Sequence, residues 1–584
     1  MVFFLEDSKD ARPLARFMRE GGGLSWADLI AFLLLAAAAV LIVQGAEQMG
    51  QPLAHLQSEP VALDPARLPE YALLTTLRMF AALIASLAFT FVVATLAAKS
   101  KKAELVIVPA LDILQSVPVL GFLTFTVTFF MGLFPGQQAG VECAAIFAIF
   151  TSQAWNMTFS FYQSLRTIPA DLDEVARQFG FSPWRRFVRL ELPFAMPGLV
   201  WNTMMSMSGG WFFVVASEAI TVGDTTVTLP GIGSWLSIAI ANKDFKAVGL
   251  AVLAMAVVIV LYDQFVFRPI VAWADKFRFE QTASQTRPGS WLYDLVRRTR
   301  LLRRLFAGLT WPIRILADLD WPRLPAAPQV RAGSMADRVL NMAWLALVTV
   351  ACLWAAWVLV AFITRTLTLS DVLTTFGLGL ATLARVAVLI AIASLIWVPI
   401  GVWIGLRPAW AERLQPVAQF FAAFPANVLF PFAVTAIVAF HLDPNIWLSP
   451  LMVLGTQWYI LFNVIAGASA IPTDMKEAAG IFGIRGWQWW RQVTLPAIFP
   501  YYVTGALTAT GGSWNASIVA EAVSWGDQHL EAAGLGSFIA KATTDGDYPR
   551  VALGIAVMCI FVILVNRLLW RPLYQYADRR LRLN

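Results

Sequence analysis

The chain has 584 residues, of which 58% are hydrophobic and only 14% are charged, and its mean hydropathy is +0.66. This composition excludes a soluble globular protein and predicts a membrane protein. The formal net charge of +6 comes from basic residues that flank the apolar runs, so it does not indicate nucleic-acid binding.

Apolar runs long enough to cross a bilayer recur along the whole chain. Lipid leaves only helices or closed barrels for a spanning backbone, and long runs without period-2 alternation favour helices. We therefore predict an all-α membrane protein with about twelve transmembrane helices, six in each half. Their expected bounds are 27–44, 71–98, 105–132, 142–165, 197–222 and 246–267, then 339–364, 376–406, 413–440, 448–467, 500–523 and 549–570.

The placement of basic residues predicts the orientation and the domains. Lys and Arg precede the first predicted span, follow the second and close the chain, whereas loops 45–70 and 133–141 carry few of them. The positive-inside rule then puts both termini in the cytoplasm. The expected organisation is a cytoplasmic segment at 1–26, a transmembrane domain at 27–268, a basic amphipathic cytoplasmic linker at 269–338, a second transmembrane domain at 339–572 and a cytoplasmic tail at 573–584.

The linker carries an arginine-rich amphipathic stretch. Residues 268–338 hold 13 Lys or Arg against 6 Asp or Glu, and Trp291–Leu316 has leucines on one face and arginines on the other. Such a helix either lies on the cytoplasmic leaflet or packs on the cytoplasmic face of the protein itself. The three cysteines, Cys143, Cys352 and Cys559, fall in apolar runs, so we predict no disulfide. We also predict no metal site and no bound cofactor.

A polar motif occurs twice, and each residue of the first copy is matched 303 positions later. An internal repeat of this kind indicates two equivalent structural units. The first copy is Glu174, Val175, Ala176, Gly180, Leu192 and Pro193, and the second is Glu477, Ala478, Ala479, Gly483, Leu495 and Pro496. In each copy a short helix stops at the glycine and a second short helix follows. We call 170–193 the first elbow and 473–496 the second elbow, and an even number of spans per half puts both in the cytoplasm.

The two elbows resemble the signature of permease subunits of ATP-binding-cassette importers of the type I fold. That signature is Glu-Ala-Ala, three residues, Gly, nine residues, Ile, one residue and Leu-Pro. The chain departs from it at Val175, where the family has Ala, and at Leu190 and Val493, where it has Ile. The resemblance covers most of 70–275 and 376–578, and Phe424-Pro425 and Ser513–Glu521 make it strongest to the nitrate/sulfonate/taurine group.

This resemblance implies two tandem six-helix permease repeats fused in one chain of the bacterial inner membrane. The elbows would be coupling helices for two ATP-binding-cassette ATPase subunits, and a periplasmic or lipid-anchored binding protein would deliver a small anion such as nitrate, sulfonate, taurine or bicarbonate. The chain lacks a Gly-x-x-x-x-Gly-Lys-Ser/Thr loop, so it is not expected to be an enzyme, and ATP and Mg²⁺ would bind to the partner subunits.

Candidate pathway residues lie in the second and fifth predicted spans of each half. Gly209-Gly210 and Gly511-Gly512 either allow close helix packing or open the backbone to a pathway. Arg78 and Arg385 either favour an anion at the axis, or reach the headgroups, or pair with Glu218 and Glu521. The full candidate set is Arg78, Arg385, Trp211, Ser513, Trp514, Asn515, Ser517, Glu218 and Glu521.

Two rival functions remain open from the residues alone. Twelve spans and a long basic central loop also fit an ion- or proton-coupled secondary transporter, although that leaves the repeated elbow without a role. A membrane scaffold that transports nothing is the other alternative. Uptake that survives removal of the ATPase would favour the first, and the absence of uptake into vesicles would favour the second.

Overall fold

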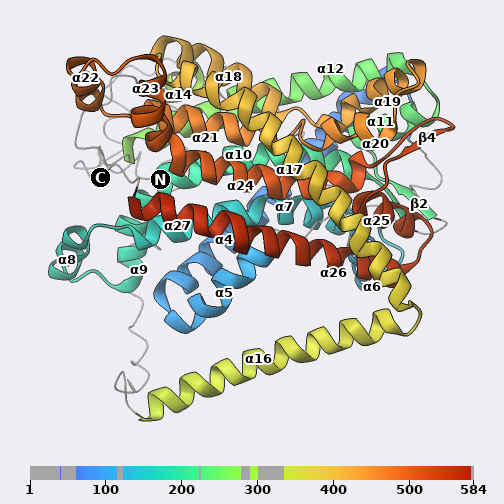
Figure 1. Ribbon diagram of the computed structural model, residues 1–584, viewed down its shortest axis with the longest axis horizontal. Coiled ribbons are helices and arrows are strands. Elements are labelled where there is room, and N and C mark those ends of the chain that lie inside the picture. Colours follow the sequence, from blue (N-terminus) through green and yellow to red (C-terminus); the bar gives the residue numbers. More distant parts are fainter. Residues whose placement is uncertain are drawn as a thin grey trace, which may run out of the picture.

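The computed structural model describes residues 40, 61–114, 123–222, 225–277, 290–299 and 335–580. These residues are almost entirely helical, apart from two short antiparallel hairpins (Figure 1). The predicted first span at 27–44 and most of the linker lie outside the described residues. Within the linker, only α14 (Trp291–Arg298) of the expected amphipathic helix is described.

The elements of the first half follow one another without a long loop among the described residues. They are η2 (Pro65–Arg67), α4 (Leu68–Lys99), α5 (Lys101–Leu114), α6 (Leu123–Leu133), α7 (Gln138–Arg166), α8 (Ala170–Gln178), α9 (Pro183–Arg186), η4 (Phe187–Glu191), α10 (Leu192–Glu218), β1 (Ala219–Val222), β2 (Thr225–Thr228), α11 (Ile232–Ala241), α12 (Phe245–Tyr262), η5 (Asp263–Phe267), α13 (Arg268–Ala274) and η6 (Asp275–Phe277).

The second half repeats this order after its own first helix. Its elements are α16 (Met335–Thr364), α17 (Leu369–Gly405), α18 (Pro408–Ala423), η7 (Ala426–Leu429), α19 (Phe430–Ala439), α20 (Pro444–Trp447), η8 (Ser449–Met452), α21 (Gln457–Ser469), α22 (Thr473–Ile481), α23 (Gly486–Trp489), η9 (Trp490–Thr494), α24 (Leu495–Ala520), β3 (Ala522–Trp525), β4 (Gln528–Glu531), α25 (Leu535–Thr544), α26 (Tyr548–Val565), η10 (Asn566–Trp570) and α27 (Arg571–Arg580).

Five continuous helices among the described residues are long and apolar enough to cross a membrane. They are Pro65–Lys99, Phe245–Ala274, Met342–Thr364, Leu369–Gly405 and Tyr548–Ala577. The predicted spans 142–165, 197–222 and 500–523 correspond to α7, α10 and α24, which have 29, 27 and 26 residues but are less apolar. These three helices lie at the centre of the bundle and carry many of its polar side chains.

The prediction of continuous spans was wrong at two places in the second half. The segment predicted at 413–440 bends by 80° between Val417–Ala423 and Ala426–Ala439, and the segment predicted at 448–467 is a pair of helices bent by 44°. The first break has a simple cause, because Phe424 precedes Pro425 and is extended with φ −71° and ψ 124°. The predicted span 105–132 likewise contains α5 and α6, and residues 115–122 between them are not described.

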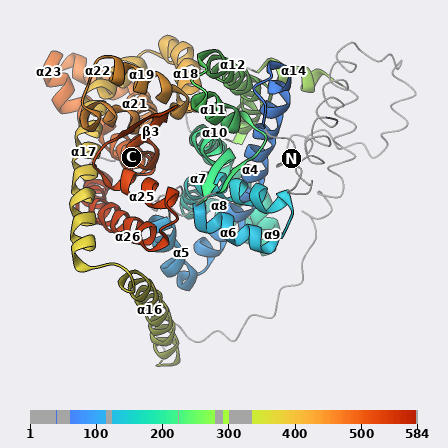
Figure 2. The same ribbon diagram turned by 90° about the vertical axis from the view of Figure 1, so that its right-hand side faces the viewer.

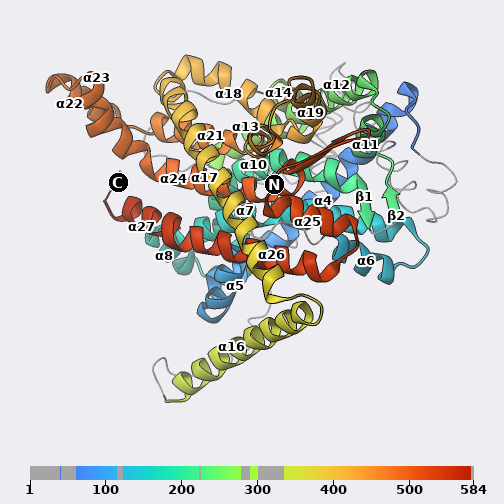
Figure 3. The same cartoon turned by 45° about the vertical axis from the view of Figure 1, so that its right-hand side comes forward.

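The two halves lie side by side and share one hydrophobic core. Figure 2 shows the first half, in blue to green, beside the second half, in yellow to red. In each half the second, fourth and fifth predicted spans pack together, as α4, α7 and α10 and as α17, α21 and α24. Helix α16 stands apart from this core and contacts α26 near the end of α16 (Figures 1 and 3). Only 6% of the most apolar stretch of α16 is buried.

Different elements lie at the two ends of the bundle. Helices α8 and α22, which begin the two elbows, lie at one end together with α27, and the hairpins lie at the other (Figures 1 and 3). We call these the elbow end and the hairpin end. In the hairpins, β1 pairs with β2 from Ala219↔Thr228 to Val222↔Thr225, and β3 pairs with β4 from Ala522↔Glu531 to Trp525↔Gln528. The fifth spans were therefore predicted to be too long, because each helix ends, and a strand begins, before the predicted end of the span.

Candidate functional site: two elbows and a cavity between the halves

Both elbows turn at the glycine that the repeat identified. Gly180 and Gly483 each have a φ of +66°, a conformation that side chains with a Cβ rarely adopt. The turn is closed by a backbone hydrogen bond from Phe181 N to Ala176 O at 3.1 Å, and from Ile484 N to Ala479 O at 2.9 Å. The two copies thus share a helix cap as well as a sequence.

Each elbow helix buries one side chain and exposes the opposite face. Ala176 and Ala479 are both 4% exposed, so a small residue is needed where the helix rests on the protein. Glu174, Val175, Glu477 and Ala478 are exposed. The first two positions of each motif therefore form a free surface, and the third anchors it.

The Leu-Pro pair follows a π-helical turn in both copies. The N–H of Leu192 donates to Phe187 O, and that of Leu495 donates to Trp490 O, five residues back in each case. Pro193 and Pro496 have no N–H and crowd the preceding turn, which favours the wider π geometry. The helix does not break at Leu-Pro. It runs through the π turn into α10 or α24, so that each elbow is continuous with a fifth predicted span.

A cavity of about 170 Å³ lies between the halves. Its walls come from α7 and α10 of the first half and from α21, α24, α26 and η10 of the second half. Among the residues that the structure describes, no Asp, Glu, Lys, Arg or His lines this cavity. Its polar lining includes Thr151, Ser152, Asn156, Ser206, Thr510 and Asn515.

Most of these hydroxyl hydrogens are already used within the helices. Thr151 donates to Ala148 O at 2.8 Å, and Thr510 donates to Ala506 O at 2.7 Å. The hydroxyl oxygens keep lone pairs for other partners. The cavity is thus a neutral, weakly polar space that can accommodate a small polar solute without binding it through a fixed charge.

The glycines near the cavity differ in the space around them. A Cβ on Gly210 would lie 2.9 Å from Gln153 Nε2, and one on Gly512 would lie 2.6 Å from Thr456 Cγ2, so these glycines permit close helix packing. Gly511 has no neighbour within 4 Å of such a Cβ and borders the cavity.

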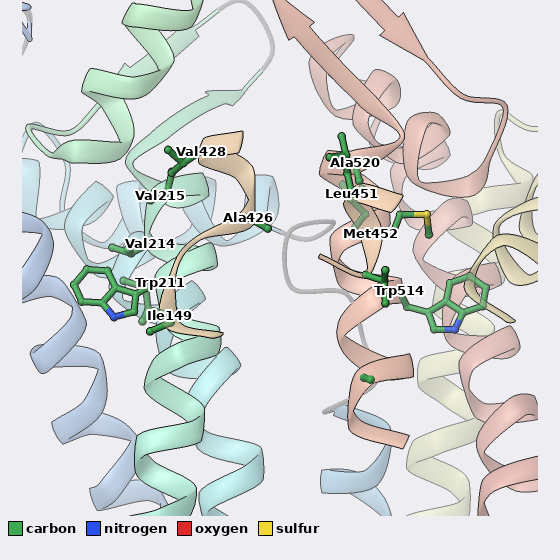
Figure 4. Packing of buried hydrophobic residues seen from close by; sticks show 14 of the residues in the cluster. Ile149, Trp211, Val214, Val215, Ala426, Val428, Leu451, Met452, Trp514 and Ala520 are labelled. Atoms are coloured by element: carbon green, nitrogen blue, oxygen red, sulfur yellow. The ribbon is translucent and has the colours of Figure 1, made fainter. Parts of the chain in front are cut away.

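The two repeated tryptophans pack within their own halves. Figure 4 shows Trp211 and Trp514 on opposite sides of the space between the halves, with their indole rings directed away from each other. Trp211 packs on Tyr262 with ring centroids 5.6 Å apart, and Trp514 stacks on Phe561 at 6.3 Å. Trp514 borders the cavity, as does Asn515, whereas Trp211 does not.

Ser513 and Ser517 are fully buried and lie away from the cavity lining. The hydroxyl of Ser513 is 2.9 Å from that of Thr456, and Ser517 donates to Trp514 O at 2.8 Å. Of the nine pathway candidates, the structure places only Trp514 and Asn515 on the cavity.

Arg78 is buried in a network of two carboxylates near the hairpin end. Its Nε and Nη2 donate to the two oxygens of Glu142 at 2.6 and 2.7 Å, and its Nη1 donates to Glu218 Oε1 at 2.7 Å. Glu218 also accepts from Gly233 N at 2.6 Å. The pairing of Arg78 with Glu218, one of the alternatives left open, is present, and neither residue reaches the cavity.

The second half repeats this network with one substitution. Arg385 Nη1 donates to Glu521 Oε1 at 2.9 Å, and Glu521 Oε2 accepts from Gly536 N at 2.7 Å. At the position of Glu142, 303 residues later, stands Asn445, whose Oδ1 lies 3.3 Å from Arg385 Nη2. Each network fastens the end of a fifth predicted span to the segment after its hairpin.

Several contacts join the halves at the hairpin end, and we call three of them the latch. Lys243 Nζ lies 2.9 Å from Asp527 Oδ2, Gly526 N donates to Ile240 O at 3.0 Å, and the rings of Phe245 and Trp525 are 4.5 Å apart. The hydrogen bond and charge of Lys243 hold the pKa of Asp527 below its ordinary value of 3.8. A further cavity of about 600 Å³ lies beside the latch between the halves.

Sequence reasoning missed Glu142 and the latch. Glu142 could have been found, because it is an acidic residue inside a predicted span. The latch carries no such signal, since Lys243 and Asp527 are separated by 284 residues.

A family of known proteins matches both halves of the chain. The family described as "binding-protein-dependent transport system inner membrane component" matches residues 69–268 and, a second time, residues 397–583. Both matches contain one elbow and one fifth predicted span.

Several characterised proteins are similar to part of the chain. A nitrate import permease protein of Leptolyngbya laminosa is 28% identical over 188 residues, which are 32% of this chain and 64% of that protein. A bicarbonate transport system permease protein of Synechococcus elongatus is 29% identical over 192 residues, or 33% of this chain and 66% of that protein. The glycine betaine/proline betaine permease protein of Escherichia coli K12 is 31% identical over 159 residues, or 27% and 42%. The chain thus spans just under two thirds of the first two relatives.

Proposed function

Because the chain belongs to the binding-protein-dependent transport system inner membrane component family and is a multi-pass integral membrane protein, we propose that it is the permease of an ATP-driven importer, with both halves in one polypeptide. The elbow end faces the cytoplasm and the hairpin end faces the periplasm. The presence of two structurally matched elbows at the same end of the bundle is the observation that carries this proposal.

In this function each elbow contacts one ATPase subunit. The exposed face with Glu174 or Glu477 meets the partner, and the continuous π turn joins that contact to α10 or α24. A movement of the ATPase subunits would therefore reach the helices that line the central cavity. Separation of the halves at the hairpin end requires the latch to open, after which a binding protein can deliver solute.

The proposed solute is a small anion such as nitrate, bicarbonate, a sulfonate or taurine. Two similar permeases are named for nitrate and bicarbonate, and the cavity of about 170 Å³ suits a solute of few atoms. Since none of the described residues that line this cavity is charged, the binding protein would select the solute and the cavity would allow its passage.

The test uses the complete importer in proteoliposomes. We expect ATP-dependent uptake of one of these anions, and no uptake when the ATPase subunits are omitted. Glycine betaine serves as the contrasting solute, because one similar permease is named for it. Uptake that persists without ATPase subunits would instead support a secondary transporter.

A glycine pair in the second elbow tests the coupling role. Gly483→Val forces a β-branched residue into a left-handed conformation, which costs about 1–2 kcal/mol and distorts the elbow. Gly480→Ala is the matched control, since this helical glycine also has open space around it. We expect Gly483→Val to lower the uptake per ATP hydrolysed, whereas equal coupling in both variants would contradict the proposal.

A further inference from the structure

We propose that the two elbows are unequal docking sites, and that the second elbow binds its ATPase subunit more tightly through an apolar surface. The inference rests on the proposed function, because it concerns the ATPase contact. It comes from comparing the elbows position by position, with 303 residues between matched positions.

The second elbow exposes three large apolar side chains. Ile481, Phe482 and Trp487 are 83%, 80% and 73% exposed, and they lie on either side of Gly483. Isolated exposed apolar residues need no explanation, but a cluster at the end of a membrane protein indicates a binding surface. We call these three residues the apolar face.

In the first elbow, only one of the three matched positions holds an apolar side chain that is as exposed as those of the apolar face. Its matched residues are Gln178, Phe179 and Trp184, of which Phe179 is 73% exposed. Gln178 is polar, and the ring of Trp184 stacks on Phe187 at 5.9 Å instead of extending outwards. The shared phenylalanine indicates one kind of partner for both elbows, and the other two positions make the surfaces unequal.

A chain of ion pairs holds the first elbow to the membrane helices. Arg186 lies 2.7 Å from Asp173 and 3.1 Å from Glu191, and Glu191 lies 3.0 Å from Lys99 at the end of α4. Arg177 adds a contact of 2.8 Å to Asp173. These charges are satisfied within the chain, so little of their electrostatic energy remains for a partner.

The second elbow has none of these ion pairs among its described residues. The positions of Asp173, Arg177, Arg186 and Glu191 are occupied by Lys476, Gly480, Trp489 and Thr494. The second elbow therefore lacks this ionic network among its described residues, and the side chains exposed beside its glycine are large and apolar. A partner that covers Ile481, Phe482 and Trp487 removes three large side chains from water, which is the main source of affinity in protein contacts.

The occupant of the apolar face is an ATPase subunit with an apolar groove. Both elbows lie at the same end of the bundle and expose the same phenylalanine, so that the surface of the second elbow extends the contact already proposed for both. The first elbow meets the second ATPase subunit through Phe179 and through Val175, which is 47% exposed. The polar side chains of Glu174 and Gln178 complete this surface.

The experiment exchanges residues between the elbows. The full chain in nanodiscs is titrated with the purified ATP-binding-cassette ATPase subunit of the proposed importer. We expect Ile481→Gln with Trp487→Ala to weaken binding about tenfold or more. The reciprocal change, Gln178→Ile, should strengthen binding at the first elbow. Phe482→Ala should cost several-fold more affinity than the matched variant Phe179→Ala.

Salt provides a second measurement of the same difference. Raising NaCl from about 0.1 to about 0.5 M screens exposed charges and leaves apolar contacts intact. The larger loss of affinity in Phe482→Ala than in Phe179→Ala should therefore persist at the higher salt concentration. Size-exclusion profiles and melting temperatures equal to those of the wild type show that the exposed substitutions leave the fold intact.

Two outcomes separate this inference from the proposed function. Equal losses at Phe179 and Phe482 at both salt concentrations would overturn the inequality while the permease function stands. A wild-type chain that binds no ATPase at all would refute the proposed function itself.

Discussion

Each half contains an arginine in its second predicted span that pairs with the glutamate at the end of its fifth predicted span. Arg78 is fully buried, and Arg385 has 14% of its side chain exposed. A buried charge is stable only when partners replace its water, and here the partners are glutamates and backbone groups. The repeat adds an internal comparison, since Glu142 of the first half corresponds to Asn445 of the second.

This correspondence predicts that the two acidic partners of Arg78 differ in importance. Glu142→Gln leaves Arg78 paired with Glu218 and the carbonyl of Pro230, which resembles the arrangement in the second half. Arg78→Met leaves two buried carboxylates without a counter-charge, and breaking such a pair typically costs about 3–5 kcal/mol. We expect thermal unfolding in detergent to show a large fall in Tm for Arg78→Met and a small one for Glu142→Gln.

The second half supplies the control for this prediction. Arg385→Met should lower Tm less than Arg78→Met, because Arg385 is more exposed and faces one glutamate rather than two. If Glu142→Gln were as unstable as Arg78→Met, the second carboxylate would be essential and the comparison with Asn445 would fail.

The site could be predicted from the sequence where residue type alone carries the information. The elbow glycines and the pairing of Arg78 with Glu218 follow from the left-handed turn and from the cost of a lone buried charge. The pathway residues could not be predicted equally well. Trp211 and Ser517 lie on the same helices as cavity residues, but the rotation of a helix in its bundle depends on all of its neighbours.

At the level of elements, the hairpins are the feature that hydropathy cannot detect. Both follow a fifth predicted span, and both contain a Gly-Asp dipeptide, at 223–224 and at 526–527. A glycine followed by a polar residue is a turn signal between strands. Apolar residues continue from each helix into its strand, so a search for apolar runs extends the helix instead.

The latch predicts that the hairpin end must open during transport. A variant with Lys243→Cys and Asp527→Cys, in a background without the three native cysteines, places two thiols where the halves meet. We expect oxidation to cross-link these positions and to stop uptake in proteoliposomes, and a reducing agent to restore it. Uptake that continues in the cross-linked protein would show that the latch stays closed during transport.

The ion pair between Lys243 and Asp527 also predicts how uptake depends on pH. Since Lys243 lowers the pKa of Asp527, the ion pair is present above the ordinary pKa of 3.8 and is lost only as the pH falls below it. Wild-type uptake measured from about pH 6 to about pH 8 should therefore show no change that depends on this pair. Either single cysteine variant, treated with the same oxidant, controls for non-specific oxidation.

For the whole molecule, the repeat predicted more of the architecture than the hydropathy did. Two halves with matched elbows were expected, and both elbows do lie at the same end of the bundle. The number of continuous spans was less predictable. The break at Phe424-Pro425 arises from the proline, and apolar composition continues through it and through the bend between α20 and α21.

The opposite ends of the bundle give a final prediction about orientation in the membrane. In a cysteine-free background, single cysteines are placed at Phe179, Phe482 and Asp527, all of which are exposed. A maleimide that cannot cross the inner membrane should label Asp527→Cys in cells with a permeable outer membrane, because the hairpin end faces the periplasm in the proposed function. It should label Phe179→Cys and Phe482→Cys only after the inner membrane is opened. Since both elbows lie at one end, their labelling must agree, and an elbow labelled from outside would contradict a shared cytoplasmic docking face.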